Sequence, residues 1–307
     1  MKYILPSVLC LTLSLMASPN FAQKVKTDKA LKEKILELSK DFEGDVGVYL
    51  YHTKKHKEVA IQADTIFPTA SIVKVPILVG IFHKIKSGAL KYREPLQYST
   101  DQYYGGSGLM QYFQDSTKTD LSTAITLMIT FSDNVASLWC QDLAGGGEEI
   151  NRLMAQYGLE HTRVNSRTPG RQKIWEKYGW GQTTPREMAQ LMLKIRNGEI
   201  IDPIYSERMY RHLTHIFYDE NAVSSMSPYV QTASKQGAVD ASRSEVVLVN
   251  APHGDFVLYI GTKNNKDQSW GSDTNEAQAL IRAISKTVWE HYEPGSEWKN
   301  TSGDLFL

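Results

Sequence analysis

The stretch Thr69-Ala70-Ser71-Ile72-Val73-Lys74 opens a continuous apolar run, residues 75–82, and the rest of the chain is organised around it. If a helix begins at Ser71, Lys74 lies on the same face one turn later, within reach of the serine hydroxyl. That pairing suits acyl transfer, because an amine held in apolar surroundings can activate a weak nucleophile. A plainer interpretation is also open, since serine is a preferred residue at helix N-termini. The same four-residue pattern recurs in the polar tail, as Ser296-Glu297-Trp298-Lys299, with no apolar run after it.

Length and composition place the chain among ordinary globular proteins. Its 307 residues suffice for a full core, and 34 basic residues balance 34 acidic ones. This balance argues against a nucleic-acid-binding surface or a strongly cationic membrane surface. We therefore expect no nucleic-acid partner. The protein is also expected to be a monomer.

The first residues have the pattern of a secretory signal. Lys2 precedes an apolar segment, residues 4–16, and small residues follow up to Ala22. We expect residues 1–22 to be removed, the mature protein to be periplasmic or secreted, and no stable membrane insertion afterwards. Cys10 leaves with the signal, so Cys140 has no disulfide partner within the mature chain; its apolar setting predicts a buried thiol.

Strand-like segments lie near both ends of the mature chain, with a mostly helical block between them. The strand predictions cover residues 46–52, 58–62, 232–239, 245–250 and 256–262, and helices are predicted at residues 26–42 and 275–292. This order predicts an α/β (α+β) fold: a five-stranded antiparallel sheet flanked by the N- and C-terminal helices, with an all-helical lobe inserted. We predict one catalytic domain, residues 23–307, with an α/β lobe at about 23–70 and 216–307 and a helical lobe at about 71–215. A site is expected in the cleft between the lobes.

Two further motifs support a functional interpretation of the Ser71-Ile72-Val73-Lys74 pattern. Ser132-Asp133-Asn134 joins two apolar helical runs, and Lys235-Gln236-Gly237-Ala238 lies on the first strand after the helical block. Each is weak alone, since Ser-Asp-Asn is also an ordinary turn or capping string. Together, in this order and at these spacings, they resemble the Ser-x-x-Lys, Ser-Asp-Asn and Lys-Thr-Gly set of class A β-lactamases and penicillin-binding proteins. The resemblance covers essentially the whole mature chain.

The resemblance implies a role for each motif. Ser71 would attack a carbonyl, Lys74 would help to remove its proton, and Ser132 would pass a proton to the leaving nitrogen. Asn134 would hold Lys74 and the substrate amide, and Lys235 would supply positive potential for the substrate carboxylate. The backbone N–H groups of Ser71 and Ala238 would form the oxyanion hole, with Gly237 beside it on the strand.

Three other residues are weaker candidates for substrate binding. Arg243, on the next strand, is either a carboxylate ligand or an arginine that balances Asp240 or Glu245. Tyr104, in a glycine-rich stretch at residues 103–108, is either a stacking residue at the cleft rim or a packed loop aromatic. Gln236 replaces the usual threonine or serine, and its amide would donate from a longer arm.

The sequence departs from the class A pattern where deacylation would be catalysed. The family's loop glutamate has no counterpart in Arg167-Thr168-Pro169-Gly170-Arg171-Gln172, and Glu176 is the sole acid between residues 164 and 182. The leading interpretation is a secreted serine hydrolase of class A β-lactamase type. The alternative is a penicillin-sensitive DD-peptidase that acts on peptidoglycan stem peptides, with slow β-lactam deacylation and Glu176 or a water held by Lys74 as the candidate base. A third is a non-catalytic binding protein on the same fold.

The expected partners are small: a β-lactam or a peptidoglycan stem peptide. No cofactor is predicted. No metal site is predicted either, because His212 and His215 lack a third ligand.

Overall fold

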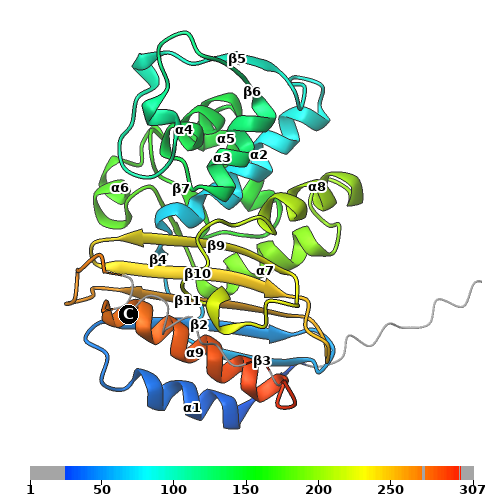
Figure 1. Ribbon diagram of the computed structural model, residues 1–307, viewed down its shortest axis with the longest axis vertical. Helices are drawn as coiled ribbons and strands as arrows, with labels where there is room; N and C mark the ends of the chain where they lie inside the picture. The colour runs from blue at the N-terminus through cyan, green and yellow to red at the C-terminus, as the bar shows by residue number, and fades with distance from the viewer. Residues whose placement is uncertain (1–24, 272–273, 297, 299–307) are drawn as a thin grey trace, which may run out of the picture.

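A mixed sheet forms one side of the molecule in the computed structural model, which describes residues 25–271, 274–296 and 298 (Figure 1). In spatial order its strands are β1 (Lys26–Thr27), β3 (Lys57–Ile61), β2 (Asp45–His52), β11 (Phe256–Lys263), β10 (Ser242–Val249) and β9 (Thr232–Val239). The five predicted strands are all present and pair antiparallel, which confirms the α/β fold. The difference from the prediction is β1, a two-residue strand that pairs parallel to β3 and makes the sheet six-stranded.

The terminal helices cover one face of this sheet (Figure 1). These are α1 (Lys29–Ser39) and α9 (Glu276–Tyr292), which pack on each other. Asp28 caps α1 by accepting from the Leu31 N–H, and Asn275 caps α9 by accepting from the Gln278 N–H. Their apolar stripes, such as Leu31 and Ile35 one turn apart, pack with outward residues of β2, β10 and β11 in one buried cluster.

The other face carries α7 (Pro185–Arg196), which packs on β2, β10 and β11. The helix begins at Thr183-Thr184-Pro185, where Thr184 is the N-cap and Pro185 is in the first helical turn. Next to it lies α8 (Pro203–Leu213).

Most of the remaining helices gather beyond α7 around α2 (Lys74–Lys86) (Figure 1). They are α3 (Leu121–Thr130), α4 (Asn134–Leu143) and α5 (Gly146–Gln156). The short helix α6 (Gln172–Tyr178) lies apart from them, at the left of Figure 1. Residues 75–82 of α2 are buried on every side, which explains why this run is apolar without a polar face. The helix ends with Ser87 as its C-cap, followed by Gly88 at a φ of 77°.

Two local features differ from the sequence expectations. The stretch from Pro169 to Gly181, for which the sequence predicted no helix, contains the exposed short helix α6, whose apolar residues are too few to show a periodic pattern. Two small sheets were not anticipated: β4 (Phe67–Pro68) with β8 (Gly181–Thr183) and β7 (Arg163–Val164), and β5 (Pro95–Gln97) with β6 (Lys118–Asp120). Strands of two or three residues leave no readable alternation.

Two remaining sequence expectations concern Cys140 and the leader. Cys140 is a free, fully buried thiol on α4, and burial raises its pKa far above the usual range. The predicted signal peptide, residues 1–22, lies outside the described residues. Within the part of the chain that is described, no helix has the length and apolarity to cross a bilayer.

Candidate active site

Ser71 lies at the junction between the sheet and the helical part. It sits in a 3-10 turn, η1 (Ala70–Val73), and α2 begins only at Lys74, three residues later than the sequence predicted. The turn is anchored by Thr69, whose N–H donates to the Gly181 carbonyl over 3.0 Å. Ala70 has a φ of 42°, an uncommon conformation for a residue with a Cβ. The backbone is therefore held in a strained turn beside the serine, a feature common at functional sites.

Lys74 is the centre of the hydrogen-bond network at this site. Its Nζ lies 2.8 Å from Ser71 Oγ and 3.1 Å from Ser132 Oγ. It also donates to the Ser132 carbonyl over 2.6 Å and to Asn134 Oδ1 over 3.0 Å. The family resemblance predicted that Ser71, Ser132 and Asn134 share one site with Lys74. In the structure all three residues form hydrogen bonds with the Lys74 amine.

The electrostatics of Lys74 favour its neutral form. The side chain is fully buried, and burial together with the like charge of Lys235 lowers its pKa well below the usual value. Asp133 acts in the opposite direction. A lysine so placed can accept the proton of Ser71 Oγ, because a neutral amine has a free lone pair.

Ser132 and Asn134 are positioned by the residue between them. Asp133 is the N-cap of α4, and its buried carboxylate accepts from the N–H groups of Ala136, Leu109 and Met110 over 2.9, 2.6 and 2.8 Å. Gly108 permits this approach, because a Cβ there would lie 2.3 Å from Asp133 Cγ. Ser132 itself has a φ of 53°. The capping interpretation of Ser-Asp-Asn is thus correct for Asp133, and it coexists with the placement of Ser132 and Asn134 around Lys74.

Lys235 and Gly237 lie on β9, the strand at the sheet edge nearest to Ser71. Lys235 is fully buried, its Nζ donates to the Gln236 carbonyl, and burial lowers its pKa to about 8. A Cβ at Gly237 would lie 2.2 Å from the Thr69 carbonyl oxygen and 3.1 Å from Ser71 N. Glycine is therefore required for β9 to approach the serine turn this closely.

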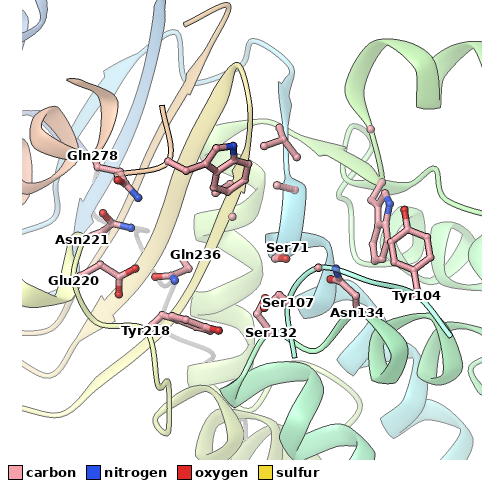
Figure 2. A pocket seen from close by; sticks show the side chains of 18 of the residues that line it. Ser71, Tyr104, Ser107, Ser132, Asn134, Tyr218, Glu220, Asn221, Gln236 and Gln278 are labelled. Carbon is pink, nitrogen blue, oxygen red and sulfur yellow. The ribbon is translucent and has the colours of Figure 1, made fainter. Parts of the chain in front are cut away.

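A cleft of about 540 Å³ runs along β9 past Ser71 (Figure 2). Ser71, Ser132 and Asn134 open into its middle, and Gln236, Gly237 and Ala238 form one wall. Aromatic rings line much of the remainder: Tyr104, Tyr178, Trp180, Tyr218 and Trp270. Its shape and polar centre suit a small molecule or an extended peptide that presents a carbonyl to Ser71.

Comparison with known proteins identifies the family of this arrangement. The model of the "Beta-lactamase enzyme family" matches residues 30–292. The chain belongs to the beta-lactamase enzyme family. Among curated relatives, Beta-lactamase VEB-1 of Pseudomonas aeruginosa is 19% identical, over 94% of this chain and 98% of its own length. A beta-lactamase of Bacillus licheniformis is 22% identical, over 84% and 82%.

Solved structures agree with this membership. PBP-A has 26% sequence identity and a TM-score of 0.78, covering 88% of this chain and 98% of its own. A mutant of PBP-A, described as an acyl-enzyme complex with penicillin G, has the same identity and TM-score. A class A beta-lactamase from Mycobacterium abscessus is 20% identical, with a TM-score of 0.76 over 87% of this chain and 100% of its own, a likeness of fold alone.

Arg243 is not among the residues that line the Ser71 cleft. Its guanidinium donates to the backbone carbonyls of Val239, Asp240 and Ser269 and lies 4.6 Å from the ring centroid of Trp270. The side chain is 1% exposed, so it is not a surface arginine either. It supports the Trp270 side of the β9–β10 hairpin, and its position gives no support to the predicted role as a carboxylate ligand.

Glu176 is also away from the cleft. It is exposed on α6, where Gln172 Nε2 donates to it over 3.3 Å, and it is not among the residues that line the Ser71 cleft. Tyr104, in contrast, does line the cleft, with its ring edge-on to Trp180 at a centroid distance of 5.1 Å. Tyr104 is therefore a packed aromatic residue that also faces the cleft, and its stacking on a substrate stays a prediction.

Several lining residues escaped the sequence analysis. Trp180 lies directly before β8, and Lys74 Nζ is 5.9 Å from its ring centroid. Glu220, Asn221 and Gln278 line the opposite end of the cleft, from a loop and from α9. Trp180 could have been singled out from the sequence, because it stands just ahead of Thr183-Thr184-Pro185. Glu220, Asn221 and Gln278 belong to no motif and come together only in the fold.

Proposed function

We propose that this protein is a serine acyl-transfer enzyme that opens amide bonds, including that of β-lactams, through an acyl-enzyme on Ser71. The observation that carries the proposal is the position of Lys74 Nζ, 2.8 Å from Ser71 Oγ and 3.1 Å from Ser132 Oγ in a fully buried setting. A buried amine between two hydroxyls can take a proton from one and return it through the other. A non-catalytic binding protein would have no need of such an arrangement.

The proposed acylation step uses residues already in contact. Ser71 Oγ bonds to the substrate carbonyl carbon while its proton passes to Lys74 Nζ. The developing oxyanion accepts hydrogen bonds from the backbone N–H groups of Ser71 and Ala238, for which one donor is typically worth about 3–4 kcal/mol. The carbon–nitrogen bond then breaks, the leaving nitrogen takes the Ser132 hydroxyl proton, and Lys74 returns its extra proton to Ser132.

The site offers no carboxylate close to Ser71, among the described residues, that could activate water to release the acyl group. Among the described residues, Glu220 is the one carboxylate that lines the cleft, and it lies at the far end from Ser71 (Figure 2). Glu176 is exposed elsewhere, and the Trp180 ring lies beside Lys74. We infer that β-lactams leave a long-lived acyl-enzyme, which favours a penicillin-sensitive DD-peptidase on peptidoglycan stem peptides over a rapidly turning-over β-lactamase. The predicted signal peptide would take the enzyme to the compartment that holds this substrate.

Intact-protein mass spectrometry after a brief exposure to penicillin G tests the proposal. The expected result is the mass of one covalent penicilloyl adduct that persists for minutes, with a single burst on a chromogenic cephalosporin. Sustained turnover would show a β-lactamase with Lys74 or a bound water in the deacylation role. The control is Ser71→Ala, which should show neither adduct nor burst; if wild type also shows neither, the acyl-transfer proposal is wrong.

A further inference from the structure

An aromatic stack lies against the turn that carries Ser132. The ring centroid of Phe131, the residue before Ser132, is 5.0 Å from that of Phe217, with 28° between the ring planes. The N–H of Phe217 also donates to the Thr130 carbonyl over 3.1 Å. Phe217 belongs to the segment that follows α8, so this segment is attached at two points to the end of α3.

The ring of Phe217 is largely exposed to solvent. The residue is 61% exposed, so its burial adds little to the stability of the core. Its second ring contact is with Tyr218, edge-on at a centroid distance of 5.2 Å, and Tyr218 lines the Ser71 cleft. Figure 2 shows Tyr218 on the same side of the cleft as Ser132. The contacts of this exposed ring are thus with two residues that adjoin the site.

The turn that Phe217 contacts holds Ser132 in an uncommon conformation. Ser132 has a φ of 53°, and such a residue persists only where its surroundings hold it. Within the described residues its hydroxyl has one hydrogen-bond partner, Lys74 Nζ at 3.1 Å. The direction of the hydroxyl therefore depends on the backbone of the turn. The contacts that hold this backbone include a hydrogen bond of 3.1 Å from Ser107 Oγ to the Phe131 carbonyl, and the stack on Phe217.

In the proposed acylation step, on which this inference rests, Ser132 acts when the carbon–nitrogen bond breaks. The Ser132 hydroxyl proton passes to the leaving nitrogen, and Lys74 returns to Ser132 the proton that it took from Ser71. A misdirected hydroxyl would slow this transfer, because a general acid must lie within hydrogen-bond reach of the atom that it protonates. The attack of Ser71 on the carbonyl carbon makes no such demand on Ser132.

We propose that Phe217 is a positioning residue for protonation of the leaving group. Its stack on Phe131 holds the turn so that Ser132 Oγ is directed at the leaving nitrogen. Phe217 is not among the residues that line the cleft, so it acts through Phe131 and not by contact with the substrate. The role is specific to substrates whose leaving atom must be protonated, such as amides. It is absent for a leaving group that departs as an anion, such as a thiolate.

Two substrates separate leaving-group protonation from the rest of acylation. Penicillin G and the thioester of phenylacetylglycine with mercaptoacetate carry the same phenylacetylamino group next to the scissile carbonyl. In penicillin G the leaving atom is nitrogen. In the thioester the carbon–sulfur bond breaks, the thiolate keeps the electron pair, and Lys74 retains the proton taken from Ser71. Intact-protein mass spectrometry follows penicillin acylation, and release of the thiol gives kcat/KM for the thioester.

Variants then assign the effect to the stack. Phe217→Ala should slow penicillin acylation about tenfold and thioester acylation less than about twofold, because misdirection loses part of a general-acid contribution of about 10²–10⁴-fold. The thioester rate also shows that the variant is folded. Phe217→Tyr keeps a ring in the stack and should restore the penicillin rate, whereas Ser132→Ala should show the same selectivity with a larger loss. The matched control is Tyr229→Ala, since Tyr229 is 90% exposed and does not line the cleft.

Equal losses on the two substrates in Phe217→Ala would overturn the positioning role, as would a penicillin rate no lower than that of Tyr229→Ala. The same selective loss in Tyr218→Ala would assign the effect to contact between Tyr218 and the leaving half, and would also overturn it. If the wild type forms no penicillin adduct, the acyl-transfer proposal fails and this inference fails with it. An adduct in the wild type, without selectivity in Phe217→Ala, rejects this inference alone.

Discussion

At the scale of single residues, Lys74 shows what burial does to an ordinary amine. The side chain is enclosed by three hydrogen-bonding residues and by the face of Trp180, and its pKa is lowered by burial first and by Lys235 second. Asp133, the one acid that opposes this shift, is itself saturated by backbone donors. In its proposed role, Lys74 would therefore be available as a base for Ser71 without extreme alkalinity.

The pH profile of acylation provides a test of this electrostatic coupling. The acid limb of the Ser71 acylation rate should report Lys74, because the neutral amine is the proposed base. Lys235→Met removes a neighbouring positive charge, raises the pKa of Lys74 and should move that limb to higher pH. Lys235→Arg keeps the charge and should leave the limb near its wild-type position. Stopped-flow acylation by a chromogenic cephalosporin measures both, and an unmoved limb in Lys235→Met would rule out Lys74 as the titrating group.

Trp180 gives a second prediction at this scale. Its ring centroid lies 5.9 Å from Lys74 Nζ, in the cleft wall beside the proposed base. We expect Trp180→Ala to open space for water there and to shorten the life of the penicilloyl-enzyme about tenfold. The decay of the adduct mass with time measures this. Trp175→Ala, an exposed tryptophan on α6, is the control and should leave the lifetime unchanged. Equal lifetimes in all three proteins would show that solvent access is not limiting.

At the scale of elements, the contact between β9 and η1 assembles the site. The strand carries Ala238, the proposed oxyanion donor, and the turn carries Ser71, the proposed nucleophile; Gly237 sets how closely the two elements approach. The sequence showed a Lys-x-Gly pattern on a predicted strand. It did not show that the position of a Gly237 side chain is taken by the Thr69 carbonyl.

Gly237→Ala should therefore damage catalysis more than folding. A Cβ 2.2 Å from the Thr69 oxygen must push β9 away from the turn, and overpacking of this kind typically costs about 1–3 kcal/mol of stability. We expect acylation to slow about a hundredfold while the protein remains folded. Gly295→Ala, with no atom within 4 Å of the added Cβ, is the matched control. Acylation at the wild-type rate in Gly237→Ala would show that the strand can shift without loss.

Much of the element layout was predictable, for reasons specific to each element. The strands of the main sheet alternate or run apolar over five to eight residues, and α2, α7 and α9 carry clear caps or apolar runs. The exposed helix α6 and the two- and three-residue strands have no such pattern, so they were missed. Of the site, the Ser71, Ser132 and Lys235 motifs were readable in order. The polar residues at the far end of the cleft were not, because Glu220 and Gln278 are far apart in sequence and come together only in the fold.

At the scale of the whole molecule, the buried carboxyl of Glu245 links stability to pH. Burial raises its pKa from 4.5 to about 7, against hydrogen bonds from Ser234 Oγ and the Ala222 N–H. The folded protein therefore binds this proton more tightly than the unfolded chain does. Its contribution to stability is fully present below about pH 4.5 and is lost as the pH rises through about 7.

Glu245→Gln should remove this loss, because the amide does not titrate and can keep both hydrogen bonds. Relative to wild type, its free energy of unfolding should improve between pH 5 and pH 8 by a few kcal/mol, on the order of 1.4 kcal/mol per unit of pKa shift. Urea unfolding at the two pH values measures the difference. The exposed Glu33→Gln is the control and should show none. A variant that follows the wild-type pH dependence would show that Glu245 is not the responsible group.

The position of β9 has one more consequence. Within the described residues it is the last strand of the sheet, paired with β10 on one side and open to the cleft on the other. A substrate chain laid along that open side would continue the sheet by one strand, held by main-chain hydrogen bonds that do not depend on the side chains. The middle of the cleft would then accept any extended backbone, and we expect discrimination among substrates to depend on the two ends of the cleft.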